Sequence, residues 1–115
     1  MKYAIPSLGD KGLEDELGYH FGRSPFFTIW DDETNEIEVI ENRSDHFGGK
    51  GLPAEFLKEH CNGLICGGIG SRAISLCAQL GLRVFVGAEG KISKVISDFK
   101  EGKLREATSG DGCKH

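Results

Sequence analysis

A short apolar run, followed by closely spaced glycines and a helical pattern, constrains this fold more than any other feature of the sequence. The run is Gly63–Cys66, the glycines are Gly67, Gly68 and Gly70, and apolar residues recur at helical spacing over Ser71–Leu80. A buried strand, a tight turn and a helix in this order are typical of an α/β fold. The sequence therefore predicts a strand–turn–helix junction whose main-chain N–H groups are left uncovered at the start of the helix.

The same kinds of pattern predict five strands and three helices in the order β-β-β-α-β-α-β-α. Apolar and β-branched runs place the strands at 2–6, 26–30, 37–41, 64–66 and 84–86, and the helices are expected from near Pro53, over 71–80 and over 91–100. The first half reads as antiparallel and the second as right-handed parallel crossovers. We expect an α/β domain with a mixed five-stranded sheet and helices packed on it.

Glycine-rich polar segments separate these elements. Residues 7–22 and 42–51 are expected to be long loops without secondary structure, and flexible. We predict a single domain over residues 1–106 and a flexible C-terminal tail over 107–115.

Charge and hydropathy exclude several classes of protein. A net charge of −4 over 115 residues argues against broad nucleic-acid binding, which needs a basic surface. No apolar run is long enough to span a bilayer, and the N-terminus lacks the apolar core of a signal peptide. We therefore expect a cytoplasmic protein that neither enters a membrane nor binds nucleic acid.

Two histidine-containing loops are candidate binding segments. His20 is followed by Arg23, and His46 is followed by Lys50. An imidazole can ligate a metal or accept a proton, and the neighbouring cation can pair with an anion. Residues of this kind also occur as backbone-bonded or solvated loop residues, so both interpretations stay open here.

The cysteines differ in what their positions predict. Cys66 ends a strand beside the glycine turn, which makes it a candidate ligand for a soft metal. Cys113 and His115 could close over a metal from the tail, although an unimportant terminus is the alternative. Cys61 and Cys77 read as core residues, and no CxxC pair indicates a zinc ribbon.

The glycine turn itself is a candidate anion site. Gly67, Gly68 and Gly70 would expose main-chain amides, and Arg72 would add a cation. Gly68–Ala73 also spells GxGxxA, but too few strands follow it to hold a dinucleotide. Serine–histidine–acid spacing is absent and the acids cluster in turns, so we do not expect an enzyme.

Four segments together resemble one family. They are the HFGRSPFF segment that begins at His20, the loop from His46 to Gly51, the GGIG turn at 67–70, and Val86–Gly90. This combination resembles the dinitrogenase iron–molybdenum cofactor biosynthesis family, the small NifX-like domains that also resemble the C-terminal part of NifB. The likeness runs from Lys2 to about Glu106.

The resemblance implies a ribonuclease-H-like fold and the non-catalytic binding or carriage of an iron–sulfur or molybdenum-containing cluster. Some similar proteins carry a molybdenum–copper sulfide cluster, and such carriers are often empty when purified. The histidine of the HFG segment carries over to His20. The implied partners are proteins that donate and accept the cluster, with the chain itself a monomer or weak dimer.

Two other functions are consistent with parts of this sequence. The turn over Gly67–Arg72 could instead serve a regulatory module that binds a nucleotide or phosphate. A nuclease is the third hypothesis, suggested by the fold class alone and opposed by the acidic charge and the lack of clustered carboxylates.

Overall fold

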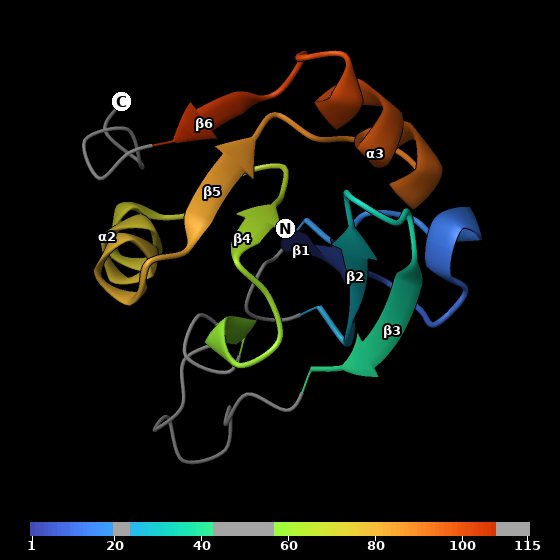
Figure 1. Ribbon diagram of the computed structural model, residues 1–115, viewed down its shortest axis with the longest axis horizontal. Coiled ribbons are helices and arrows are strands. Elements are labelled where there is room, and N and C mark those ends of the chain that lie inside the picture. The colour runs from blue at the N-terminus through green and yellow to red at the C-terminus, as the bar shows by residue number, and fades with distance from the viewer. Residues whose placement is uncertain (20–23, 43–56, 108–115) are drawn as a thin grey trace.

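The computed structural model describes residues 1–19, 24–42 and 57–107 (Figure 1). In chain order the elements are β1 (Lys2–Ser7), the 3-10 helix η1 (Gly12–Glu14), β2 (Phe26–Asp31), β3 (Ile37–Glu41), β4 (Gly63–Ile65), α2 (Ser71–Leu80), β5 (Arg83–Val86), α3 (Ile92–Lys100) and β6 (Arg105–Ala107). Leu57 and Lys58 are also helical, while the region around Pro53, where that helix was predicted to begin, lies outside the described residues.

All of these strands belong to one mixed sheet with the order β3-β2-β1-β4-β5-β6. β1, β4 and β5 run parallel, and β2, β3 and β6 pair antiparallel to their neighbours. The mixed α/β fold and the antiparallel first half are confirmed. The predicted number of five strands is wrong, because β6 adds a sixth strand beside β5. The ribonuclease-H-like assignment stays a prediction.

Helices cover both faces of the sheet and create two apolar cores (Figure 1). On one face, Ile74 and Cys77 of α2 pack with Leu57 against Leu64 of β4. On the other face, Val95 of α3 and its apolar neighbours pack against β1 and β2. The second core includes a cluster of aromatic rings: Tyr3, Trp30, Phe85 and Phe99.

The loop after β1 is more ordered than its glycine content predicts. Its described part contains η1, and Leu17 is 1% exposed within the core under α3. The Leu8 amide donates to the Glu16 carbonyl (3.0 Å), and the Gly18 amide donates to the Pro6 carbonyl (2.9 Å). The expectation of a loop without secondary structure over 7–22 is therefore wrong for 8–19, because one buried leucine and these hydrogen bonds fix it.

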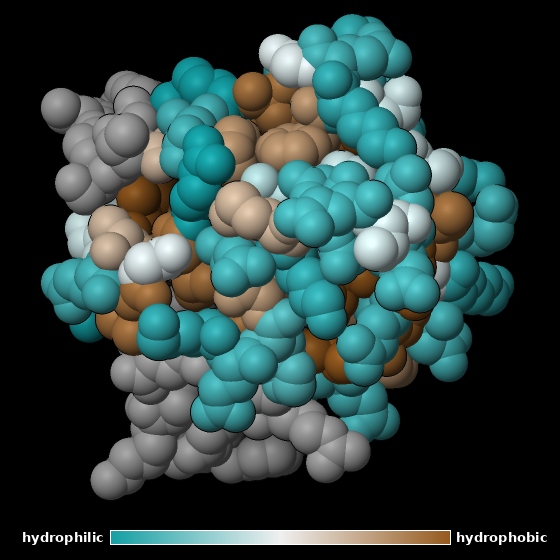
Figure 2. Space-filling model, viewed as in Figure 1, coloured by the Kyte–Doolittle hydropathy of each residue, from teal (hydrophilic) through white to brown (hydrophobic). Residues whose placement is uncertain are grey.

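Strand β6 ends at Ala107, one residue beyond the predicted domain boundary at 106, and Ala107 is buried in the first core. The rest of the predicted tail, 108–115, lies outside the described residues. Figure 2 shows mainly hydrophilic side chains over one face of the molecule, with apolar side chains between them. Among the described helices, none combines the length and hydropathy needed to cross a membrane.

Candidate functional site

The carboxyl ends of the three parallel strands meet at one edge of the sheet (Figure 1). There the Ala88 amide donates to the Cys66 carbonyl (3.1 Å), and the Gly87 amide donates to the Gly67 carbonyl (3.1 Å). Leu8 follows β1 at the same edge. Open α/β sheets characteristically bind ligands at this edge, so its groups are the first candidates for a site.

The turn from β4 into α2 presents uncovered main-chain groups. A Cβ atom placed at Gly68 or Gly70 would meet nothing within 4 Å. Gly70 is the N-cap of α2, with φ −70° and ψ 158°, and no side chain caps the helix. Within the described residues, no protein group accepts a hydrogen bond from the amides of residues 68–73. This is the positive end of a ten-residue helix, where an anion is stabilised.

Arg72 supplies positive charge beside these amides. It lies in the first turn of α2 and is exposed. In the part of the chain that the structure describes, no carboxylate pairs with it. The structure thus gives Gly68, Gly70 and Arg72 the exposed positions that an anion site needs, and their role as a site, with that of Gly67, stays a prediction.

Tyr19 lies against this turn, which fits the expectation that the segment around His20 and the glycine turn form one site. A Cβ atom at Gly67 would sit 3.2 Å from Cδ1 of Tyr19 and 3.2 Å from the Ala88 carbonyl oxygen. Gly67 therefore allows the tyrosine ring to approach the main chain closely. The only signal in the sequence was the position of Tyr19 directly before His20. The segment that leads into the first histidine loop consequently reaches the same edge as the glycine turn.

Cys66 is positioned less favourably for a metal than its sequence position suggested. Its side chain is 1% exposed, in the core between the sheet and α2, and its thiol lies 3.7 Å from the Phe85 carbonyl oxygen as a donor. Burial, with a smaller contribution from Cys77, raises the pKa of the Cys66 thiol to about 12. Metals bind the thiolate, so this environment does not favour Cys66 as a ligand.

The remaining predicted site residues lie outside the described residues: His20, Arg23, His46, Lys50, Cys113 and His115. Their roles stay predictions. Among the described residues, no group of three or more histidine, cysteine, aspartate or glutamate side chains is placed to hold a metal ion.

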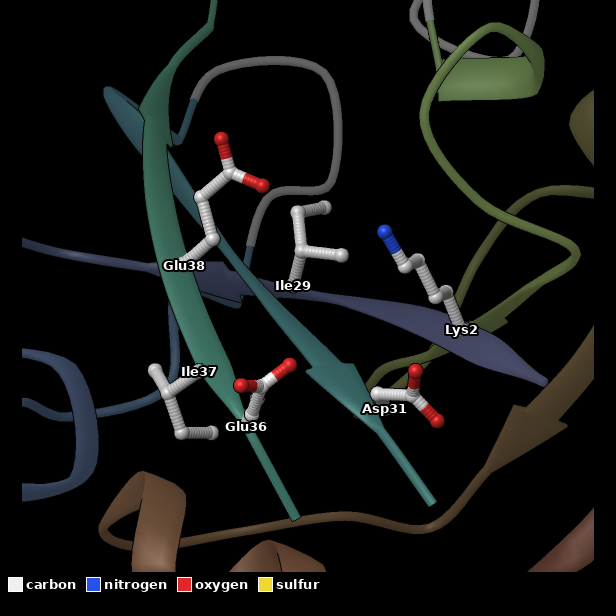
Figure 3. A pocket seen from close by; sticks show the side chains of 6 residues that line it. All are labelled: Lys2, Ile29, Asp31, Glu36, Ile37 and Glu38. Carbon is white, nitrogen blue, oxygen red and sulfur yellow. The ribbon is translucent and has the colours of Figure 1, made fainter. Parts of the chain in front are cut away.

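A separate hollow of about 260 Å³ lies over β2 and β3 (Figure 3). Its lining includes Lys2, at the amino end of β1, and three carboxylates: Asp31, Glu36 and Glu38. It therefore lies away from the edge at which the parallel strands end, and its excess of negative charge does not suit an anion.

Comparison with known proteins places the chain among relatives of similar length. An uncharacterized protein of Methanocaldococcus jannaschii is 34% identical over an alignment of 112 residues, and the match covers 92% of this chain and 91% of that protein. The crystal structure of the protein PH0822 is 37% identical, with a TM-score of 0.79 over 93% of this chain and 96% of that one. The NMR structure of a Thermotoga protein provisionally assigned as NifB is 31% identical, with a TM-score of 0.75 over 91% of each chain.

The family described as dinitrogenase iron-molybdenum cofactor matches residues 1–102. That span includes the open turn, Tyr19 and all of the strands except β6. The chain belongs to the dinitrogenase iron–molybdenum cofactor family.

Proposed function

We propose that this protein is a non-catalytic carrier that binds an iron–sulfur or molybdenum-containing cluster as cargo, at the edge where β1, β4 and β5 end. Family membership and the relative assigned as NifB support the class of cargo. The observation that carries the proposal is the uncovered row of amides at 68–73, with Arg72 beside it.

The chemistry of these groups suits a sulfide-rich cluster. Such a cluster is a bulky anion, which main-chain N–H donors and a guanidinium can stabilise without covalent ligands. A carrier must also release its cargo, so one or two replaceable ligands are a better design than a complete cage. Iron–molybdenum or molybdenum–copper sulfide clusters both meet this description.

His20 is the proposed replaceable ligand. It follows Tyr19, whose ring lies against Gly67 in the turn. The proposal also keeps Arg23, His46 and Lys50 as further contacts to the anion, and Cys113 and His115 as ligands from the tail. The cargo would come from a donor protein and pass to an acceptor.

A titration with tetrathiomolybdate tests the site directly. This dianion carries four sulfides on molybdenum and serves as a probe for the larger cargo. In oxygen-free buffer we expect it to shift the backbone amide NMR signals of Gly67–Arg72, and to bind His20→Ala more weakly than the parent without unfolding the domain.

Substitution of the N-cap separates anion binding from folding. Gly70→Asp places a carboxylate where the anion would bind, while an N-cap aspartate also favours the helix. We expect affinity to fall by more than about tenfold with stability unchanged or slightly higher. The matched variant Gly70→Asn has the same shape without the charge; because its side-chain oxygen can also accept from one of these amides, we expect a loss of affinity that is smaller than that of Gly70→Asp.

Two results would contradict the proposal. One is equal binding of tetrathiomolybdate by Gly70→Asp and Gly70→Asn. The other is a shift of Gly67–Arg72 by ATP or inorganic phosphate but not by tetrathiomolybdate, which would favour a phosphate-binding module.

A further inference from the structure

Two large apolar side chains lie exposed at the edge that holds the open turn. Tyr19 is 63% exposed and Leu8 is 56% exposed. Leu8 follows the carboxyl end of β1, and a Cβ atom at Gly18 would lie 3.7 Å from Cδ2 of Leu8. Leu8 and Tyr19 therefore flank Gly18, and the Tyr19 ring in turn contacts Gly67.

The main chain around Tyr19 is held in place rather than free. The Leu17 amide donates to the Gly90 carbonyl (2.9 Å), and the Gly18 amide donates to the Pro6 carbonyl (2.9 Å). Leu17 itself is buried under α3. The fixed backbone thus holds the ring in an exposed position. The contact between its apolar surface and water is unfavourable in free energy unless a ligand covers the ring.

An apolar wall beside a row of amides discriminates between kinds of anion. Oxoanions hold their hydration water strongly and lose it at a high cost when an apolar surface covers them. Sulfide ligands are more polarizable and less strongly hydrated, and sulfur makes favourable contacts at the positive edge of an aromatic ring. Amides alone would accept either kind of anion, so the side chains next to them decide the preference.

We propose that Tyr19 and Leu8 form the specificity wall of the site and select sulfide-bearing anions over oxoanions of the same shape and charge. This inference rests on the proposed function and adds a selection that the amide turn cannot supply. The ring of Tyr19, rather than its hydroxyl, is the selective group.

The test compares tetrathiomolybdate with molybdate, which are both tetrahedral dianions. Affinities are measured by isothermal titration in oxygen-free buffer for the parent and for Tyr19→Ala, Tyr19→Phe and Leu8→Ala. Leu13→Ala is the matched control, because Leu13 is also an exposed leucine (42%) but lines a hollow beside Trp30 and α3.

We expect the parent to prefer tetrathiomolybdate. Tyr19→Ala should weaken the binding of tetrathiomolybdate about five- to tenfold and leave the affinity for molybdate unchanged. Leu8→Ala should have a smaller effect in the same direction. Tyr19→Phe and Leu13→Ala should match the parent.

Three outcomes would overturn the inference. Suppose that tetrathiomolybdate shifts the amide NMR signals of Gly67–Arg72, but Tyr19→Ala binds it as well as the parent does. The specificity wall is then ruled out, while the proposed carrier function stands. Equal losses for both anions would show that Tyr19 supports the fold of the site rather than its selectivity. If the parent binds neither anion, both the inference and the proposed function fail.

Discussion

Two strand-to-helix junctions in the described part of this protein, β4 to α2 and β5 to α3, are alike in their strands and helix caps but differ in what covers the start of the helix. Both helices follow a parallel strand, and neither is capped by a side chain. At α3 the loop after β1 covers the junction. The Ile92 amide donates to the Asp15 carbonyl (2.9 Å), and the main chain of Glu16 forms an isolated antiparallel β-bridge with that of Lys91. At α2 no described residue fills that place.

This difference shows what converts a common structural junction into a candidate site. Every helix begins with amides that lack partners within the helix. At α3 another segment supplies an acceptor, and the junction contributes to stability. At α2 the amides stay available, so the same geometry can serve a ligand instead.

Removing the anchor of the covering loop should give the largest effect. Leu17→Ala deletes a fully buried side chain beneath α3, so we expect it to lower the free energy of unfolding by about 2–5 kcal/mol. The exposed Leu13 in the same loop is the control, and Leu13→Ala should change stability by less than about 0.5 kcal/mol. Urea unfolding followed by Trp30 fluorescence measures both. Equal losses would mean that the loop is not anchored by Leu17.

Adding one methyl group to each junction should lower the stability at the α3 junction but not at the α2 junction. Gly90 has φ +89°, a conformation that disfavours side chains, so Gly90→Ala should cost about 1–2 kcal/mol. Gly68 lacks a positive φ and has open space around its Cα, so Gly68→Ala should leave stability unchanged or raise it by up to about 1 kcal/mol. Thermal unfolding of the two variants tests this contrast, and a loss at Gly68 as large as that at Gly90 would contradict it.

The reactivity of the thiols tests whether the site at the β4–α2 junction uses its main-chain amides or the buried cysteine, Cys66. Burial raises the pKa of Cys66 to about 12, and those of Cys61 and Cys77 to about 11. These thiols are therefore protonated at neutral pH, and we expect iodoacetamide to label none of them before the protein unfolds. Mass spectrometry of peptides identifies the labelled residues. Cys66→Ala should retain tetrathiomolybdate affinity; its loss would restore Cys66 as a ligand.

The smallest expected effect is on the acid side of the stability curve. Backbone amides of Lys11 and Glu16 donate to the Asp15 carboxylate (3.0 and 2.9 Å), and they hold its pKa below the ordinary value. The folded state therefore binds this proton less readily than the unfolded chain does. The contribution is complete above about pH 4, the unfolded pKa, and is lost as pH falls through the lower folded pKa. Asp15→Asn should make unfolding less pH-dependent in that acid range than in the parent, and urea unfolding of both proteins at a series of acid pH values measures the difference.

Local patterns predicted most of the fold, and the failures have physical causes. The predicted bounds of β3 and α2 match the structure, since alternation and helical spacing both report a buried face. β6 could not be recognised, because Arg105–Ala107 has no apolar alternation. Its pairing is long-range: the Arg83 guanidinium donates to both carboxylate oxygens of Glu106 (3.0 and 2.9 Å).

The open turn was predictable from its glycines, whereas the side chains around it depend on tertiary contacts. The place of Cys66 at the strand end indicates a metal ligand, yet strand alternation puts its side chain on the same side as Leu64, in the core under α2. Tyr19 has no motif of its own. Its position depends on hydrogen bonds from its neighbours to Pro6 and Gly90, which no local pattern encodes.

The short strand β6 has a practical consequence for any shortened form of the protein. The region that matches the family is residues 1–102, so a chain trimmed to that limit would lose β6 and leave one side of β5 without hydrogen-bonding partners. An unpaired strand of this kind recruits strands from other molecules. A trimmed chain should therefore end beyond Ala107, or self-association could be mistaken for a natural oligomer.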